Sequence, residues 1–302
     1  MASGSLGHGT RRWFHRVVLV GYVLLGSVVW GAGPASAPES EVAGAAAGKD
    51  TVVVDQKTDA AIKGALKYLA AKQGPDGAWA SPDGEHPVAV TAYTLMAFLA
   101  TGHLPNEGEY GKNVQQGVKY LLSCVRADGF ITSVGVNSNR RSDMYDHGIA
   151  TIALAEIYGQ TQDPQVRAKL ATSIQLIIKV QNKQGGWRYT PGATDSDISV
   201  TVLQVVALRA AKNGGLDVPQ KTIERAVAYI KTCFDPRTGG FFYQPNNGLR
   251  PSATAAGIYS LQVCGLYDDP MVAKGSGYLM GQGRNGSEFF TYGNFIFLCH
   301  II

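Results

Sequence analysis

The stretch from Gln165 to Asn213 decides the fold of this chain. It reads QVRAKLATSIQLIIKVQ, NKQGGW, RYTPGATDSD and ISVTVLQVVALRAAKN. The first segment carries its charges on one stripe, which is typical of an amphipathic helix with one side in water. A Gly-Trp turn and a polar loop follow, and the last segment is apolar almost all round. Because a helix that is apolar on every face must be covered on every face, the stretch predicts a half-exposed helix packed on a fully buried one.

The same unit recurs along most of the chain. The aromatic residues after the turn glycines are 51, 57 and 54 residues apart: Trp79, Phe130, Trp187 and Phe241. The residues that open the second helices are 56, 52 and 53 apart: Thr91, His147, Ser199 and Ser252. Two landmarks with one period indicate a repeat protein. About five helix pairs are expected, and the alternation of half-exposed and buried helices predicts two concentric rings.

Two of the turns share a specific motif. Gln73–Trp79 (QGPDGAW) and Gln181–Trp187 (QNKQGGW) both fit Q-x-x-x-G-x-W. This pattern resembles the QW repeat of squalene and hopene cyclases, whose fold is shared by protein prenyltransferase β subunits. The resemblance covers roughly residues 55 to 292 and implies an all-α protein, an α/α toroid whose outer helices are joined through the QW turns. In that family the Trp stacks over the next helix end while the Gln amide satisfies orphan backbone groups.

The later units depart from the family pattern. Val125 and Phe234 stand where units two and four would carry the Gln. After FFTYGN the family has a full inner helix, whereas this sequence reads FIFLCHII. We therefore expect the last repeat of the toroid to be incomplete.

The first 37 residues have the order of an export signal. MASGSLGHGTRRWFHR is cationic, VVLVGYVLLGSVVWG is apolar, and Ala35-Ser36-Ala37 has the A-x-A spacing of a cleavage site. Thr10 to Phe14 resembles a twin-arginine signal. The alternative is a short membrane anchor that is not cleaved. Residues 38–54 are expected to be a linker and residues 55–302 the toroid, in a protein exported to the periplasm or the outside of the cell.

The charge of the chain argues against a nucleic-acid partner. The chain has 27 basic and 23 acidic residues, and three of the arginines lie in the predicted signal. The remainder is therefore nearly neutral, whereas a nucleic-acid-binding domain needs a basic face.

The four cysteines do not form a clear disulfide framework. Cys124 and Cys233 occupy the same place in their units, each four residues after a Tyr. Buried, unreactive cysteine is a common packing residue, so structural thiols are expected, with disulfides as the alternative in an exported protein.

The loops before the buried helices hold the candidate site. In a toroid of this family these loops converge on one end of a central cavity, where ligands bind. Unit two carries Asp143, Tyr145, Asp146 and His147, and unit four carries Arg250. We expect these five residues to contact the ligand. The repeat aligns Asp143 with Asp195, and Tyr145 with Asp197 and Arg250.

Unit three carries the candidate catalytic residues. Asp195-Ser196-Asp197-Ile198-Ser199 resembles the D-x-D-D-T motif of hopene-type cyclases, which implies that Asp197 donates a proton and that Asp195 assists it. Such an acid needs burial and a neighbouring carboxylate to stay protonated. The third acid of the motif is Ile198 here. The alternative is that Asp195 or Asp197 only caps the helix that begins near Ile198, a role worth about 1 kcal/mol.

No metal and no cofactor are expected. The prenyltransferases bind zinc through Asp, Cys and His. Asp195 matches the first ligand, but Asp197 stands in the place of the Cys, and Tyr292-Gly293-Asn294 occupies the region of the His. His147 is expected to be a polar residue at a helix start rather than a zinc ligand.

Two functional hypotheses remain. The first is an exported toroid that holds a hydrophobic, isoprenoid-like molecule, or a peptide or partner protein, in its central cavity without turnover. The second is an active terpene cyclase or prenyltransferase that uses Asp197 as general acid. The missing third acid, the short fifth unit and the lack of room for a second toroid favour the first.

Overall fold

The computed structural model describes residues 55–81, 84, 86–133 and 143–283, and within these ranges the chain is almost entirely helical. The helices are α2 (Gln56–Ala71), α3 (Pro87–Ala100), α4 (Gly111–Ser123), α5 (Met144–Thr161), α6 (Pro164–Lys179), α7 (Ile198–Asn213), α8 (Gln220–Thr232), α9 (Pro251–Val263) and α10 (Pro270–Gly283). Strands β1 (Phe242–Gln244) and β2 (Asn247–Leu249) form an antiparallel hairpin directly before α9.

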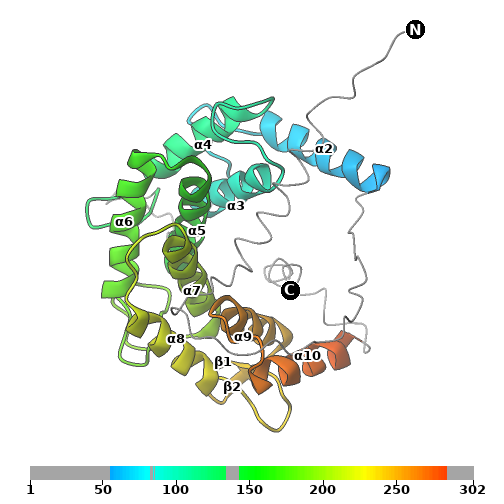
Figure 1. Ribbon diagram of the computed structural model, residues 1–302, viewed down its shortest axis with the longest axis vertical. Helices are drawn as coiled ribbons and strands as arrows, with labels where there is room; N and C mark the ends of the chain where they lie inside the picture. The colour runs from blue at the N-terminus through cyan, green and yellow to red at the C-terminus, as the bar shows by residue number, and fades with distance from the viewer. Residues whose placement is uncertain (1–54, 82–83, 85, 134–142, 284–302) are drawn as a thin grey trace, which may run out of the picture.

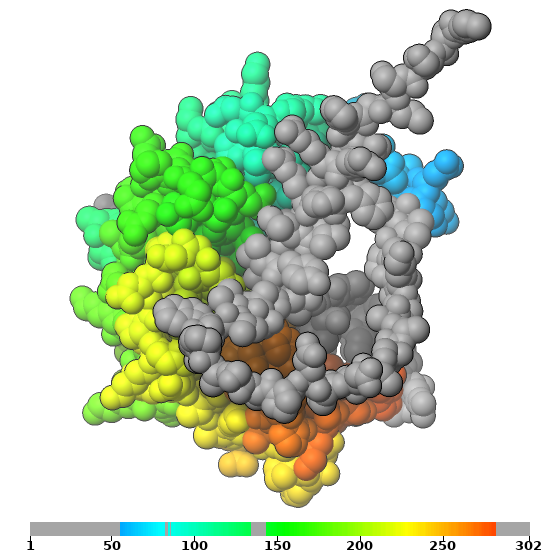
Figure 2. All heavy atoms as spheres, in the orientation of Figure 1, coloured from blue at the N-terminus to red at the C-terminus, as the bar shows by residue number. Residues whose placement is uncertain are grey.

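The helices form an α/α toroid, as predicted. Helices α3, α5, α7 and α9 make an inner arc, and α2, α4, α6, α8 and α10 surround it (Figure 1). Each inner helix packs against its inner neighbours, α5 against α3 and α7, and α9 against α7. The outer helices α4, α6, α8 and α10 follow one another along the rim in the space-filling view (Figure 2). The expected fifth inner helix, the signal and the linker all lie outside the described residues.

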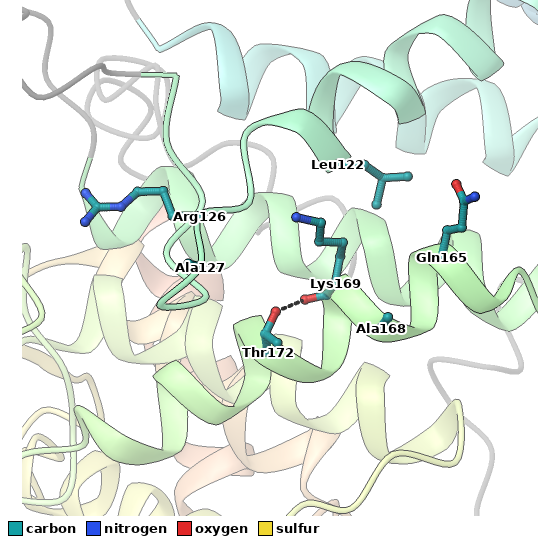
Figure 3. Close-up of a pocket in the computed structure, with 7 residues that line it drawn as sticks. All are labelled: Leu122, Arg126, Ala127, Gln165, Ala168, Lys169 and Thr172. Carbon is teal, nitrogen blue, oxygen red and sulfur yellow. Dashed lines mark hydrogen bonds between the residues drawn. The ribbon is translucent and has the colours of Figure 1, made fainter.

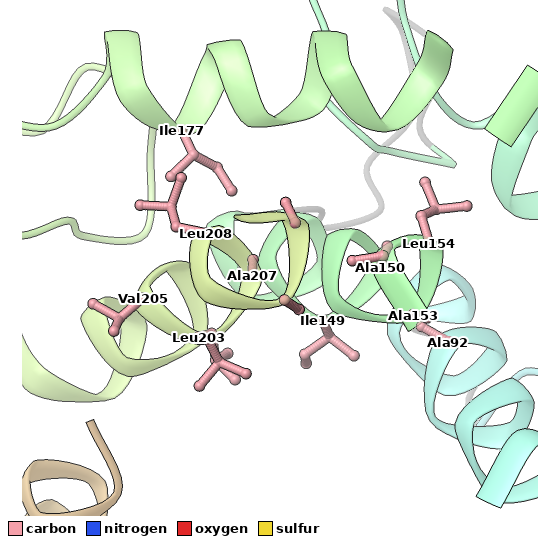
Figure 4. Close-up of a cluster of buried hydrophobic side chains, with 14 of the residues drawn as sticks. Ala92, Ile149, Ala150, Ala153, Leu154, Ile177, Leu203, Val205, Ala207 and Leu208 are labelled. Carbon is pink, nitrogen blue, oxygen red and sulfur yellow. The ribbon is translucent and has the colours of Figure 1, made fainter. Parts of the chain in front are cut away.

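Burial separates the two layers as the sequence pattern predicts. In α7, 13 of 16 residues are buried, whereas α2 buries only Leu66. Small and branched side chains of α5 and α7 fill the space between the inner helices, and Ile177 reaches them from α6 (Figure 4). This packing is the main source of stability, since each buried Leu or Ile side chain contributes about 1.5–3 kcal/mol. Within the described ranges, no helix is long and apolar enough to cross a bilayer.

The two Q-x-x-x-G-x-W turns use the same hydrogen bonds. Nε2 of Gln181 donates to the carbonyl oxygens of Gly185 and Thr222, at 2.7 and 2.9 Å. Gln73 does the same to Gly77 and Asn113, both at 2.9 Å. Thr222 and Asn113 lie in the first turns of α8 and α4, so each Gln joins its turn to the next outer helix.

The Trp of each turn binds the preceding helix. Nε1 of Trp187 donates to the carbonyl of Ile177 at 2.9 Å, and Trp79 donates to Leu69 at 2.7 Å. Both carbonyls lie in the last turn of a helix, where the carbonyl groups run short of intrahelical donors. The Trp therefore binds the C-terminal end of its own outer helix, and Trp79 also packs on the next one as expected, since a Cβ at Gly117 of α4 would lie 2.8 Å from its ring.

Hydrogen bonds between the turns and the inner helices fix the repeat register, and three of the aligned positions were wrong. Four turn residues donate their backbone N–H to an inner-helix side chain: Trp79 to Thr91, Ile131 to His147, Trp187 to Thr201 and Phe241 to Thr254, over 2.9 to 3.2 Å. Ile131, not Phe130, thus takes the place of the Trp in unit two. Thr201 and Thr254, not Ser199 and Ser252, correspond to His147. Loops of unequal length before the inner helices caused the shift.

Glycine at position 185 is required by its conformation and by close packing. Its φ is +96°, and a Cβ there would lie 2.4 Å from the carbonyl oxygen of Arg225. Gly215 has a similar φ of +84° but open space around it. It is therefore a matched control for the backbone strain alone.

We expect Gly215→Ala to lower the free energy of unfolding by about 1–2 kcal/mol, the cost of a left-handed residue with a side chain. Gly185→Ala should cost clearly more, because α8 must also move. Urea unfolding of both variants measures the difference. Equal losses would show that the contact with Arg225 is relieved without cost.

The cysteines behave as structural thiols in the described part of the chain. Cys124 and Cys233 are the C-cap residues of α4 and α8, which confirms their equivalence. Both are buried, neither they nor the half-buried Cys264 forms a disulfide, and burial raises the pKa of the Cys233 thiol to about 11. The fourth cysteine lies outside the described residues.

Candidate functional site

The candidate site lies at the N-termini of three adjacent inner helices. Their N-cap residues are Asp143 for α5, Asp197 for α7 and Arg250 for α9. Asp143 therefore corresponds to Asp197 and to Arg250, not to Asp195 as the sequence alignment had it. A carboxylate suits a helix N-terminus because it accepts free backbone N–H groups and complements the helix dipole.

Asp197 is fully buried at the centre of this site. Its Oδ1 accepts hydrogen bonds from Ser199 Oγ at 2.5 Å and from the backbone N–H of Val200 at 2.9 Å. The capping interpretation is thus confirmed for Asp197. Burial raises the pKa of the carboxyl, while these hydrogen bonds and Arg188 act in the opposite direction.

Arg188 links the two predicted acids. Its Nη1 lies 3.5 Å from Asp197 Oδ2, and its Nε lies 3.5 Å from Asp195 Oδ2. Neither Nη1 of Arg188 nor Oδ2 of Asp197 makes a hydrogen bond with a described residue. The pair is therefore held by charge attraction across a gap rather than by a direct hydrogen bond.

Aromatic rings surround the guanidinium of Arg188. Its Cζ lies 4.7 Å from the centre of the Tyr189 ring and 5.7 Å from that of Tyr243. The hydroxyls of these two tyrosines are hydrogen-bonded to each other. Arg188 thus occupies an aromatic, acidic environment of the kind that stabilises a cation.

Tyr145 and Ser199 connect units two and three. Tyr145 Oη lies 2.5 Å from Ser199 Oγ, and the Tyr145 ring packs against Tyr189 with centroids 5.8 Å apart. Because Ser199 donates to Asp197, its oxygen is free to accept the Tyr145 proton. This gives a continuous hydrogen-bonded chain from Tyr145 to the buried carboxylate, and burial raises the pKa of Tyr145.

Asp195 lies at the edge of the site. Its side chain is 52% exposed, and besides Arg188 it accepts a 3.3 Å hydrogen bond from Nε2 of Gln244 on β1. The same Gln244 nitrogen donates to the carbonyl of Ser196 at 2.8 Å. The hairpin is thereby attached to the loop that carries both acids.

Arg250 directly follows the hairpin, at the start of α9. Its Cζ is 5.0 Å from the centre of the Tyr243 ring, and its Nε donates to the carbonyl of Gly248 at 3.3 Å. Its side chain is half-buried. Among the described residues no carboxylate lies within ion-pair distance of it.

The remaining predicted site residues are arranged differently. Asp146 is buried on α5, and its Oδ1 lies 3.0 Å from Nδ1 of His86, so it faces unit one rather than Asp197. His147 is fully buried, its Nδ1 accepts the N–H of Ile131, and its ring stacks on Phe130 at 5.5 Å. Burial lowers the pKa of His147 to about 4. Its contacts are those of a structural residue, equivalent to threonine in the other units.

The prediction that no metal binds stays a prediction. Nowhere in the described ranges do three His, Cys, Asp or Glu side chains gather as metal ligands. Of the residues considered for zinc, His147 accepts a backbone hydrogen bond and Asp195 is paired with Arg188.

A surface cleft of about 440 Å³ lies away from this site (Figure 3). Gln165, Lys169 and Thr172 of α6 form one side, and Leu122, Arg126 and Ala127 lie near the end of α4. Lys169 Nζ donates a hydrogen bond to the carbonyl of Val125, so this side chain attaches the turn after α4 to α6. The expected central cavity stays a prediction.

Several site residues escaped the sequence analysis. Tyr189 and Tyr243 both stand two residues after the turn aromatic, Trp187 and Phe241, so the repeat itself carried a signal for them. Arg188 has no such signal. Its importance depends on the fold of the loop that brings it to Asp197 and on Tyr243, which is distant in sequence.

Comparison with known proteins defines the class by fold. No family model and no curated protein sequence matches the chain. Type II terpene cyclase MstE from Scytonema, in its apo structure, is similar with TM-score 0.53 and 22% identity over 76% of this chain and 64% of its own. A variant of MstE from Scytonema bound to the substrate geranylgeranyl dihydroxybenzoate matches with TM-score 0.51 and 21% identity over 77% of this chain and 64% of its own.

A sugar enzyme has the same fold. Cellobiose 2-epimerase from Spirochaeta thermophila matches with TM-score 0.51 and 13% identity over 76% of this chain and 69% of its own. The chain is therefore an α/α toroid protein with a terpene-cyclase-like fold that spans about two thirds of the length of the cyclase. At these identities the likeness concerns the fold, and function must be argued from the site.

Proposed function

We propose that this protein is an exported toroid that binds an isoprenoid-like molecule near the N-termini of α5, α7 and α9 and does not convert it. The main observation behind this proposal is the position of Arg188. Its guanidinium lies beside Asp197 and on the faces of Tyr189 and Tyr243. In a cyclase, an acid of this kind must reach an alkene and aromatic faces must be free for the carbocation.

The contacts of Asp197 support binding over proton donation. Oδ1 accepts two hydrogen bonds, and Oδ2 faces a permanent cation. A carboxylate satisfies all three contacts, whereas a proton on Oδ2 would point at a guanidinium. The apolar ligand class is supported by the inner helices, which are rich in Val, Ile, Leu and Ala. It is also supported by the prenyl substrate bound by the structurally similar MstE.

Export is the second part of the proposal. Residues 1–37 would direct the chain out of the cytosol. The alternative is that this segment is not cleaved and anchors the protein to the membrane. Detection of the protein in periplasmic or culture fractions, with mass spectrometry of its N-terminus, tests this part. A cytosolic chain that begins at Met1 would contradict it.

The alternative is an active cyclase or prenyltransferase. One observation favours it, since burial raises the pKa of Asp197, as a general acid requires. In this case Arg188 would have to leave Asp197 when substrate binds.

Asp197→Asn separates the two hypotheses. We expect the wild-type chain to bind geranylgeraniol and squalene in titration calorimetry, and to yield no cyclised or transferred product by gas chromatography and mass spectrometry. The variant keeps the hydrogen-bond acceptor at the cap, and it too should yield no product. A product made by the wild type and lost in Asp197→Asn would overturn binding without turnover. Failure of every prenyl compound to bind would overturn the ligand class.

A further inference from the structure

An Asn-Gly pair lies at the start of β2. The hairpin reads Gln244-Pro245-Asn246-Asn247-Gly248, and Gln244 of β1 pairs with Asn247 of β2. Asn246 and Gly248 both have a left-handed backbone, with φ of +62° and +72°. Asn247 is exposed, so water reaches its side-chain amide. Each strand has only three residues, and a hairpin this short opens readily.

An asparagine followed by a glycine can lose its amide group without an enzyme. The backbone nitrogen of Gly248 gives up its proton and forms a bond to Cγ of Asn247. The bond from Cγ to Nδ2 breaks and ammonia leaves, so a five-membered succinimide ring remains. Water then opens the ring on one side or the other and gives aspartate or isoaspartate. Glycine favours ring closure because it has no Cβ to hinder the backbone rotation that brings the two atoms together.

Arg250 places a positive charge beside this peptide bond. Its Nε donates to the carbonyl of Gly248 at 3.3 Å, and a Cβ built on Gly248 would lie 2.9 Å from its Nη2. Ring closure requires a nitrogen anion and then builds negative charge on the oxygen of the attacked amide. A nearby permanent cation lowers the free energy of both.

We propose that Asn247 is a modification site, at which the hairpin converts the asparagine to isoaspartate and aspartate, with water as co-reactant and ammonia as product. The short hairpin provides the mobility, Gly248 the attacking nitrogen and Arg250 the charge. This modification is independent of the ligand that the protein binds.

Asn213-Gly214 is a matched control within the same chain. Asn213 is the last residue of α7, a helix of 16 residues, and the backbone N–H of Gly214 is bound to the carbonyl of Ala210 at 3.0 Å. The end of the helix has to open before this nitrogen reaches Cγ of Asn213. The third such pair in the sequence, Asn285-Gly286, lies outside the described residues.

The modification changes the hairpin that is attached to the candidate site. Isoaspartate routes the main chain through the former side chain, which lengthens the backbone and disturbs the pairing of position 247 with Gln244. Nε2 of Gln244 donates to the carbonyl of Ser196, in the loop before α7. The modification is therefore expected to weaken the attachment of this loop to the hairpin.

Ageing of the full wild-type chain in neutral buffer tests the site. Samples are digested at intervals, and mass spectrometry with electron-transfer fragmentation separates isoaspartate from aspartate and assigns each to a position. We expect Asn247 to deamidate at least about tenfold faster than Asn213, since tenfold corresponds to only about 1.4 kcal/mol of additional opening free energy in the helix. The rate should rise with pH, because the nitrogen must lose its proton. Asn247→Gln should remove the signal. A rate at Asn247 no higher than at Asn213, or one that does not change with pH, would overturn the proposal.

Variants test the contribution of Arg250. Arg250→Gln should slow the deamidation of Asn247 several-fold, and Arg250→Lys should retain most of the wild-type rate. Arg237→Gln is the control and should leave the rate unchanged, because this arginine is 83% exposed and paired with Asp235. Circular dichroism shows that each variant is folded. A rate that is the same in Arg250→Gln as in the wild type would overturn the role of this charge.

Discussion

Trp187→Ala is expected to lower the free energy of unfolding by about 3–5 kcal/mol, the range for a large aromatic residue removed from a core. Trp187 is 1% exposed, and its indole N–H is bound to the carbonyl of Ile177. The variant loses the packing and leaves that carbonyl without its donor. Urea unfolding followed by circular dichroism measures the loss.

Two further variants separate the contributions of Trp187. Trp187→Phe keeps most of the buried ring but removes the N–H, so a loss of about 1–2 kcal/mol is expected. Trp79→Ala should cost about as much as Trp187→Ala, because Trp79 is also buried and donates to Leu69 in the same way. A loss below about 1 kcal/mol for either alanine variant would show that the turns do not hold the outer ring together.

His147→Thr is expected to change how stability depends on pH. Burial lowers the pKa of His147 from 6.5 to about 4, so the folded protein keeps this ring neutral where the unfolded chain binds a proton. The stabilising contribution of the neutral ring is therefore complete above pH 6.5 and is lost as the pH falls towards 4. At about 1.4 kcal/mol for each pKa unit, the loss amounts to about 3 kcal/mol.

Threonine is the informative replacement because units one, three and four carry it at the equivalent position. A threonine introduced in this place would accept the N–H of Ile131, as the threonines of the other three units accept the N–H groups of their own turns. At pH 7 the variant should lose some stability through the missing contact with Phe130. As the pH falls from 6.5 to 4, the gap between wild type and variant should close or reverse.

Phe130→Leu is the control for the pH experiment. It removes the ring that stacks on His147 but keeps the titrating group, so this variant, unlike His147→Thr, should still lose stability as the pH falls from 6.5 to 4. If the difference between wild type and His147→Thr stays constant over this range, then His147 is not held neutral by the fold.

Two positions at the start of each inner helix have different roles in the repeat. The residue that accepts the turn N–H is structural in all four described units, and this is why His147 belongs to the core. The N-cap residue, four positions earlier in units two to four, differs in charge from unit to unit, as Asp143, Asp197 and Arg250. The residue at the cap can therefore change in charge without disturbing the attachment of the turn.

Sequence alone determined the toroid. The stretch from Gln165 to Asn213 contains an amphipathic helix, a Gly-Trp turn and an apolar helix, and these follow from side-chain periodicity and local turn chemistry. Repetition of this unit then required two layers, since the apolar helices have to be covered. The role of Asp197 as an N-cap was also among the sequence hypotheses, because capping depends on residues close in the chain.

Only the tertiary structure decided the register of the repeats and the composition of the site. The hydrogen bonds from Ile131 to His147 and from Trp187 to Thr201 cross loops of unequal length, so counting residues placed the equivalent positions two residues away. Tyr243 and Arg188 are 55 positions apart, and they meet because neighbouring repeats stack side by side. Contacts between repeats depend on how each unit is placed on the next, and this placement is set by the packing of the inner helices as a whole rather than by any single motif.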